Sequence, residues 1–207
     1  MHLLELDLKA GLHDGDTERV LDGIRMLGNM RHLQSTAELL ALLDSPDALM
    51  RTHAYEALLR LHDYSVLSAV DEWLETQPQA PHELFLPRDA LFEMQFRLGR
   101  EIASIRDPAT VPVVVRLLHL QSPIMRGRVL QALRAIRSPQ SAPSLLQMLD
   151  DPDADNGFGA MQGLIELAGG GVVDWVPSWP EFRRNPTYYA ARCREWWQTE
   201  GQQKAAR

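Results

Sequence analysis

The sequence has little cysteine and no long apolar run. Cys193 is the single cysteine of the 207 residues, which excludes an internal disulfide and any metal cluster built from several thiolates. No stretch approaches the roughly 18 apolar residues of a membrane span. The N-terminal segment, MHLLELDLKAGLHDGD, carries acidic residues where a signal peptide needs basic ones. We therefore expect a cytoplasmic protein that does not enter a membrane.

Catalytic motifs are also lacking. The GGG at 169–171 ends a predicted helix instead of following a strand, so it is no phosphate-binding loop. Cys193 lies in YYAARCREWW with no histidine after His119, and we interpret it as a buried or half-buried helical residue, not a nucleophile. His53 and Glu56 could share a metal, but no second helix offers a comparable pair, which favours a solvated or half-buried pair. We predict no catalytic residue, no metal and no cofactor.

The charged residues are segregated along the chain. Residues 1–93 carry 7 basic and 17 acidic side chains, whereas residues 94–137 carry 8 basic and 2 acidic ones. Residues 138–181 have 7 acidic and no basic side chains, and residues 182–207 have 6 basic and 2 acidic ones. This alternation argues against a uniform nucleic-acid-binding surface. The acidic N-terminal half instead favours a protein partner with a basic surface.

An internal repeat of 31 residues indicates the fold. Residues 106–118, RDPATVPVVVRLL, and 137–149, RSPQSAPSLLQML, share Arg, two Pro, an apolar pair and a final Leu, and 31–43, RHLQSTAELLALL, fits the same frame. Upstream, MRTHAYEALLRL at 50–61 matches MRGRVLQALRAI at 125–136. Two segments of helical length in each repeat predict a helix pair.

Register steps of 31, 44, 31 and 31 align apolar residues in columns on one face of the first helices, as a buried stripe requires. These columns are Leu27, Leu58, Ile102, Leu133 and Leu164, and Met30, Leu61, Ile105, Ile136 and Leu167. The longer step corresponds to a Pro-rich insert at 77–89. We predict one all-α domain over 1–207, an α-solenoid of about five helix pairs with a Trp-rich C-terminal cap at 171–207. The predicted repeats are 14–44, 45–76, 88–120, 122–150 and 151–170.

The MR-x5-AL first helix, the R-[DS]-P-x3-P start of the second helix and the DP turn resemble HEAT-like repeats. The resemblance covers roughly residues 14–168 and is closest to the short bacterial kind named after phycobilisome lyases. It implies an α-solenoid in which the column of Arg31, Arg106 and Arg137 is structural. Tetratricopeptide and ankyrin repeats are disfavoured because their signatures are absent. Fold similarity alone does not transfer activity.

Enzymes with HEAT-like folds offer three alternatives. Deoxyhypusine hydroxylase binds iron through repeated His-Glu dyads, but this sequence has one such dyad, His82-Glu83 in the insert. A bilin lyase activity is implied by the family name, and no residue pattern here would hold a tetrapyrrole. The alkylpurine DNA glycosylases bind DNA through a basic surface, but acidic segments flank the arginines here, and we expect these arginines to form intramolecular ion pairs. They are Arg97, Arg100, Arg116, Arg126, Arg128, Arg134 and Arg137.

The second helices offer a surface for a partner, because in HEAT solenoids they line the concave face. The repeat period places Ala41, Glu72, Arg116 and Gln147 in one exposed column, and Glu38, Ala69, Val113 and Ser144 in another. Asp71 falls in a column that otherwise reads Leu40, Val115 and Leu146. A carboxylate in an apolar column is costly unless it is paired or exposed, and exposure is the interpretation we favour.

The C-terminal segment holds four of the five tryptophans and departs from the repeat. Terminal repeats must cover an exposed core end, which predicts a cap. The alternative is an aromatic hot spot for a protein partner in RCREWW, because Trp and Arg dominate interface energetics. The predicted partner-binding residues are Glu38, Asp71, Glu72, Glu75, Arg116, Gln147, Trp196 and Trp197.

The sequence thus predicts a non-catalytic, bacterial protein-interaction or scaffolding module whose protein partner presents a basic surface. An immunity protein that neutralises a cationic toxin is one alternative. A HEAT-like enzyme, related to the DNA glycosylases or bilin lyases, is the other.

Overall fold

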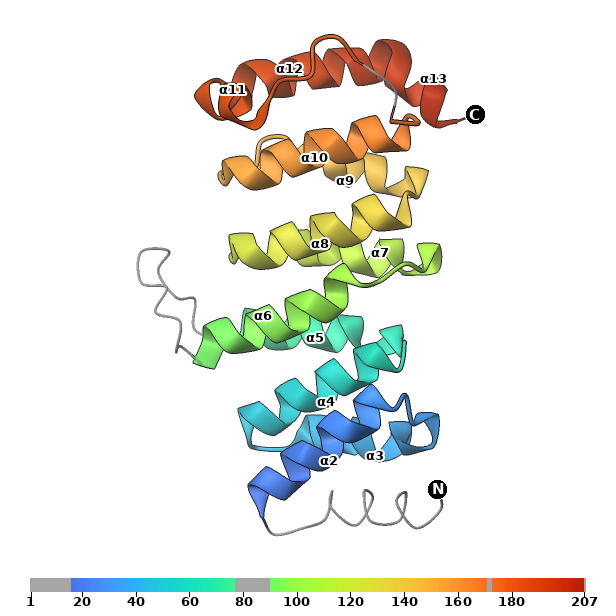
Figure 1. The fold of residues 1–207 in the computed structure, drawn as a ribbon, viewed down its shortest axis with the longest axis vertical. Helices are drawn as coiled ribbons and strands as arrows, with labels where there is room; N and C mark the ends of the chain where they lie inside the picture. The colour runs from blue at the N-terminus through green and yellow to red at the C-terminus, as the bar shows by residue number, and fades with distance from the viewer. Residues whose placement is uncertain (1–15, 77–89, 171–172, 207) are drawn as a thin grey trace. The chain divides into compact units, whose positions relative to one another are not determined.

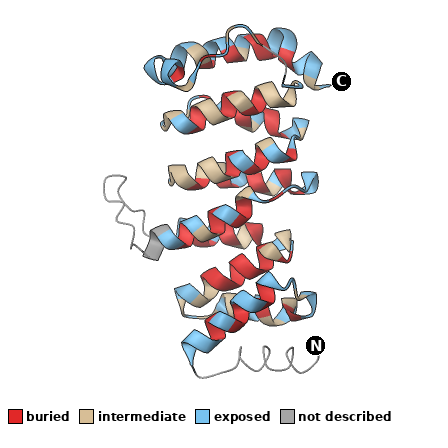
Figure 2. Ribbon diagram, in the orientation of Figure 1, coloured by how far each residue is buried: buried red, intermediate tan, exposed pale blue. Residues whose placement is uncertain are grey.

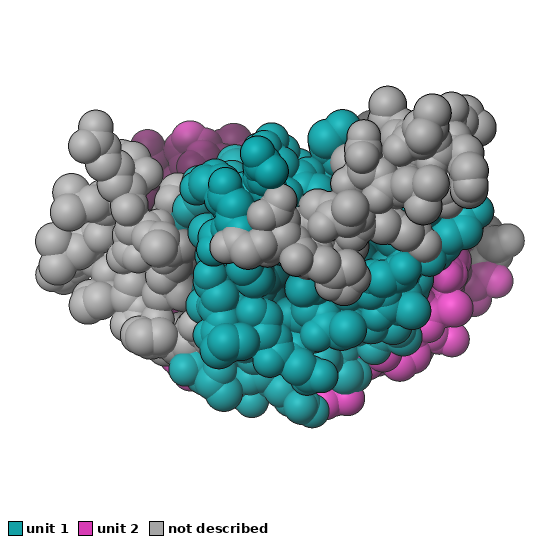
Figure 3. Space-filling view, turned by 90° about the horizontal axis from the view of Figure 1, so that it is seen from below, with its two compact units in different colours: residues 1–101 teal, residues 102–207 magenta. Residues whose placement is uncertain are grey.

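The computed structural model describes residues 16–76, 90–170 and 173–206, and across these residues it contains helices and no strand (Figure 1). The predicted insert at 77–89, with its His82-Glu83 dyad, lies outside the described residues. The chain divides into two compact units, Met1–Glu101 and Ile102–Arg207 (Figure 3). None of the described helices is long and apolar enough to cross a membrane.

The first unit alternates long helices with shorter ones. α2 packs against α4, and α3 packs against α4. α6 begins in this unit and its last two residues belong to the second. The elements are α2 (Thr17–Asn29), η1 (Leu33–Ser35), α3 (Thr36–Ala41), η2 (Leu42–Asp44), α4 (Ala48–Arg60), η3 (Tyr64–Val66), α5 (Leu67–Glu75) and α6 (Ala90–Ala103).

The second unit continues the alternation and then changes. α8 packs against α10, and α10 also packs against α9, α11 and α12. The elements are η4 (Pro108–Thr110), α7 (Val111–Val114), η5 (Val115–His119), α8 (Pro123–Ile136), η6 (Pro139–Ser141), α9 (Ala142–Met148), α10 (Ala154–Leu167), α11 (Trp179–Arg184), α12 (Pro186–Trp196), the π-helical turn η7 (Trp197–Gly201) and α13 (Gln202–Ala205).

Polar residues in the predicted turns cap the helices. The Asp47 carboxylate accepts a hydrogen bond from the Leu49 backbone N–H at 2.8 Å at the start of α4. Ser122 caps α8 and Asp153 caps α10 in the same way. Each such cap satisfies a backbone donor that has no partner inside the helix and contributes about 1 kcal/mol. The turn sequences therefore set where the long helices begin.

The apolar columns form the core, visible as buried stripes along the helices (Figure 2). Met30 departs from the prediction with 51% of its surface exposed, because it is the C-cap of α2 and no described helix precedes α2 to cover it. Close approach of the helices also depends on Gly28, where a Cβ would lie 2.9 Å from Ala57 Cα. The first column is buried completely, at 0% exposure for each of Leu27, Leu58, Ile102, Leu133 and Leu164.

Candidate protein-binding surfaces

The second helices of the first unit present a surface of one charge. Residues 33–44 and 64–76 contain five acidic residues and no lysine or arginine. Glu72 and Glu75 are exposed on α5, and Glu38 is partly exposed on α3. We call Glu38, Glu72 and Glu75 the acidic second-helix surface. Among the described residues of the first unit, the lysines and arginines lie on or beside the first helices, so the two kinds of helix differ in charge.

The negative charge of the second helices affects the pKa of a nearby tyrosine, Tyr55. Burial raises the pKa of Tyr55 above its ordinary value, and the charges of Glu72 and Asp44 raise it further, against the opposing effect of Arg51. Arg51 is held in place: its guanidinium lies 5.9 Å from the centre of the Trp73 ring, and its Nη1 donates to the Ser45 carbonyl. Two acidic residues of the second helices, Glu72 and Asp44, therefore both raise the pKa of Tyr55 on α4.

Asp71 does not lie on that surface, and the expectation that it is exposed was wrong. Only 5% of its surface is accessible. The buried face of α5 is wide, because Leu67, Val70, Trp73 and Leu74 are buried along with it. Asp71 thus lies inside the packed face and cannot reach a partner from there.

The other predicted partner-binding residues lie in the second unit. Arg116 on η5 and Gln147 on α9 are exposed. Trp196 and Trp197 are buried, with 6% and 5% of their surfaces exposed. Their rings pack edge to face at 6.2 Å, and Trp196 also contacts Trp175 at 5.9 Å. The structure therefore does not present these two tryptophans to a partner.

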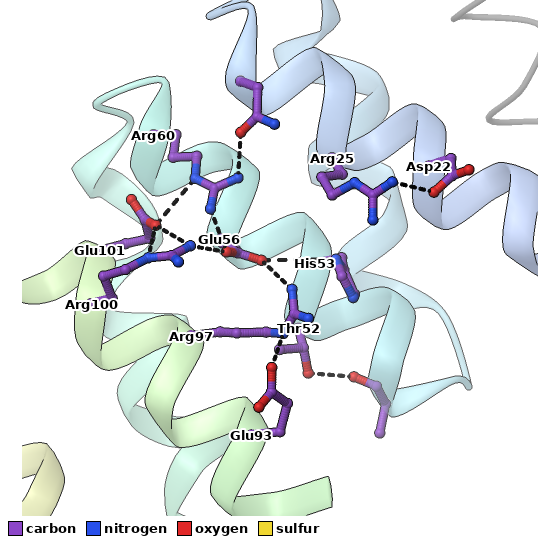
Figure 4. A network of polar contacts seen from close by, with 12 residues as sticks. Asp22, Arg25, Thr52, His53, Glu56, Arg60, Glu93, Arg97, Arg100 and Glu101 are labelled. Atoms are coloured by element: carbon purple, nitrogen blue, oxygen red, sulfur yellow. Dashed lines mark hydrogen bonds and ion pairs between the residues drawn. The ribbon is translucent and has the colours of Figure 1, made fainter.

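A buried ion-pair network lies on the first helices of the first unit (Figure 4). Glu56 on α4 has 2% of its surface exposed. Its Oε1 accepts hydrogen bonds from Arg60 Nη2 at 2.5 Å and from Arg100 Nη2 at 2.8 Å. Its Oε2 lies 3.6 Å from Arg97 Nη1. A buried carboxylate without partners is costly, so these cations offset the cost of burying the Glu56 carboxylate.

The network extends to a third helix. Glu101 accepts from Arg60 Nε and from Arg100 Nε, both at 3.1 Å. Arg60 Nη1 also donates to Asn29 Oδ1 on α2 at 2.7 Å. The contacts therefore tie α2, α4 and α6 together. We call this set the Glu56 network: Asn29, Glu56, Arg60, Glu93, Arg97, Arg100 and Glu101.

The sequence pattern contained a signal for this network. The register step of 44 places Glu56 in the same column as Arg100, and His53 in the same column as Arg97. Applying the repeat to charged residues, as well as to apolar ones, would have placed these groups side by side. His53 and Glu56 are both buried, with 8% and 2% of their surfaces exposed. The expectation of a solvated or half-buried pair was therefore wrong.

His53 is buried beside the network, with 8% of its surface exposed. Burial lowers the pKa of His53 below its ordinary value, as do the charges of Arg97, Arg25 and Arg60, against the opposing effect of Glu56. Within the described ranges, no group of three or more His, Cys, Asp and Glu side chains is placed to hold a metal ion.

Four of the arginines that suggested a DNA-binding surface form the predicted intramolecular pairs. Arg97 and Arg100 belong to the Glu56 network. Arg126 forms two hydrogen bonds with the Asp151 carboxylate, at 2.7 and 2.9 Å. Arg134 pairs with Glu166 on α10. These pairs confirm that the four arginines are not arranged as one continuous basic surface for DNA.

The cysteine is buried as predicted. Cys193 on α12 has no exposed surface, and burial raises its pKa to about 12. Because of this raised pKa, Cys193 stays protonated at neutral pH. The thiolate, which is the reactive form of cysteine, is therefore scarce. This agrees with a packing role.

Comparison with known families supports the repeat interpretation. The family model for HEAT repeats matches residues 85–164. This similarity and the all-helical structure support a HEAT-like repeat protein with an α-solenoid fold. No curated protein matches the chain.

Proposed function

We propose that this protein is a non-catalytic protein-binding module whose acidic second-helix surface binds a partner with a basic surface. HEAT repeats commonly mediate protein–protein interaction or scaffolding. The observation that carries the proposal is the charge of the second helices in the first unit, which hold five acidic residues and no lysine or arginine. Opposite charges across an interface raise the association rate and select the partner.

The remaining contacts support this surface over its competitors. Three arginines of the first helices, Arg60, Arg97 and Arg100, belong to the Glu56 network, where the charges compensate one another. Trp196 and Trp197 are buried within the second unit and are therefore not accessible to a partner. Glu72 and Glu75 are exposed one turn apart on α5, where a basic surface can approach them.

The proposal includes a full array of about five repeats of the short bacterial kind, closed by the Trp-rich C-terminal segment. Phe182 on α11 is completely buried and its ring contacts Phe158 on α10 at 5.4 Å. Because α11 and α12 both pack on α10, we assign the helices after 173 the role of covering the last repeat.

A paired capture experiment tests the function. The wild type and a variant with Glu38→Lys, Glu72→Lys and Glu75→Lys are used to capture proteins from a lysate of the native organism. We expect a basic protein that is retained by the wild type and lost with the variant.

A matched control reverses three exposed acidic residues on the first helices, Glu18→Lys, Asp22→Lys and Glu93→Lys, for the same change in net charge. This control should retain the partner. Equal loss with both variants would show that only net charge matters. Capture of no protein, together with tight binding to alkylated DNA or to a bilin, would favour a HEAT-like enzyme.

A further inference from the structure

A solvent-open depression of about 460 Å³ lies between α8 and α10 of the second unit. Its lining is part polar and part apolar, and it brings two guanidinium groups together with one carboxylate. The lining residues are Gln131, Arg134, Ala135, Arg137 and Glu166.

Arg134 forms a fixed wall of the depression. Its Nε and Nη2 donate to the two oxygens of Glu166, at 3.0 and 2.6 Å. Its aliphatic stem passes close to Gly163, where a Cβ would lie 3.0 Å from Arg134 Cγ. A bidentate pair and a packed stem leave little rotamer freedom, so Arg134 is preorganised before any ligand arrives.

Hydrogen-bond donors remain free around this wall. Arg134 Nη1 has no acceptor among the described residues, and neither does the guanidinium of Arg137. The Gln131 Oε1 accepts from Arg128 at 3.2 Å, which leaves the amide N–H groups of Gln131 available. The one carboxylate, Glu166, is already paired. The depression therefore offers side-chain donors and positive charge, and its one side-chain carboxylate is already paired.

Arg137 adopts a backbone conformation that favours glycine. Its φ is +54°, in the left-handed region, which costs a non-glycine residue free energy. A basic residue after a helix can offset this cost by bonding to the last carbonyls. Arg106, at the same repeat position but without a positive φ, donates to the carbonyls of Ala103 and Ile105. Arg137 makes no such side-chain bond within the described residues, so its guanidinium is left for another use.

We propose that this depression binds an oxyanion, a phosphate or carboxylate group of a ligand, between Arg137 and the free Nη1 of Arg134. Guanidinium groups pair with such oxyanions through two parallel N–H donors. Glu166 orients Arg134, and Arg137 supplies the uncompensated charge. This site is independent of the acidic second-helix surface and would serve a second, anionic ligand.

The test is an NMR titration of the full chain with inorganic phosphate and, separately, with acetate. We expect saturable shifts of the Arg134 and Arg137 side-chain signals and of the backbone near 131–137, and the stronger anion indicates which group the ligand carries. Arg137→Gly removes the guanidinium and relieves the left-handed strain, so it should fold as well as the wild type. It should weaken the binding of the stronger anion at least about ten-fold.

Two further variants make the outcome decisive. Arg31→Gly is the matched control, because Arg31 has the same repeat position and a φ of +51° but lies in the first unit. It should leave anion binding unchanged. Glu166→Gln removes the competing negative charge and should tighten binding about three-fold. Unchanged binding in Arg137→Gly, equal weakening in Arg31→Gly, or shifts that do not saturate would overturn the proposal.

Discussion

Basic residues end several first helices in a conformation that glycine adopts more readily. Arg31, His62 and Arg137 have φ values of +51°, +62° and +54°. Each follows the last turn of its helix, where a left-handed residue commonly terminates the hydrogen-bond pattern. Side chains with a Cβ accept this conformation at a cost of about 1 kcal/mol or more.

We predict that Arg31→Gly raises the free energy of unfolding by about 1 kcal/mol, because it relieves the left-handed strain. Urea unfolding measures the change. Arg106→Gly is the control at the same repeat position. Arg106 has no positive φ and donates to the carbonyls of Ala103 at the end of α6 and of Ile105 beyond it, so its replacement should destabilise. Destabilisation by Arg31→Gly would show that its side chain contributes more than the strain costs.

His53 should make the free energy of unfolding fall as the pH is lowered. Because burial and nearby arginines lower its pKa in the folded state, the unfolded chain takes up a proton first as the pH falls through about 6.5. The contribution of neutral His53 is therefore complete above this pH and is lost below it.

We predict that the wild type loses more stability than His53→Gln when the pH falls from about 7.5 to about 5.5. Urea unfolding at both values gives the two differences. Parallel losses in the two proteins would mean that other groups cause the dependence and that His53 does not.

Among the elements, α4 and α6 are joined by charge as well as by apolar packing. Glu56 is buried on α4 and two of its arginine partners lie on α6. Removing one member of a buried ion pair leaves uncompensated charge and costs about 3–5 kcal/mol, although the exposure of Arg100 reduces this through solvent screening.

We predict that Glu56→Gln lowers the free energy of unfolding by about 2–3 kcal/mol. Glu93→Gln is the matched control: it removes a carboxylate from the exposed end of the same network and should cost at most about 0.5 kcal/mol. Thermal or urea unfolding compares the two. Equal effects would contradict the central position of Glu56.

The sequence predicted the apolar part of each element better than the polar part. Leu58 and Leu133 fall in a column whose burial follows from helical periodicity alone. Asp71 does not follow this logic, because the width of the buried face on α5 depends on how the neighbouring helices pack. The apolar pattern does not predict the Glu56 network either, but for a different reason. Its partners come from separate repeats, and only the register relates them.

At the scale of the molecule, α11, α12 and η7 pack on α10, and we propose that they form an aromatic cap. Phe182, Trp196 and Trp197 are buried there. Truncation after Gly170 should therefore expose apolar surface on α10 and lower the free energy of unfolding by at least about 2 kcal/mol, the value of one large apolar side chain. Chemical unfolding with a dye for exposed apolar surface measures both effects. An equally stable fragment would instead favour a binding role for the tail.

Counts of charged residues along the sequence do not show which charged side chains pair with one another in the fold. The acidic excess of residues 1–93 was evident from the sequence. Which of those charges compensate one another depends on the fold, because Arg60 and Arg100 on the first helices pair with Glu56 and Glu101, which also lie on first helices. The proposed binding surface therefore follows from which side chains share a face.

The most direct test is the affinity for the captured partner, measured by calorimetry at about 50 and about 300 mM salt. The wild type should bind more weakly at the higher salt concentration. The variant with Lys at positions 38, 72 and 75 should bind at least about ten-fold more weakly at low salt and lose most of the salt dependence. The first-helix control should match the wild type. Equal affinity and equal salt dependence in all three proteins would contradict the proposed binding surface.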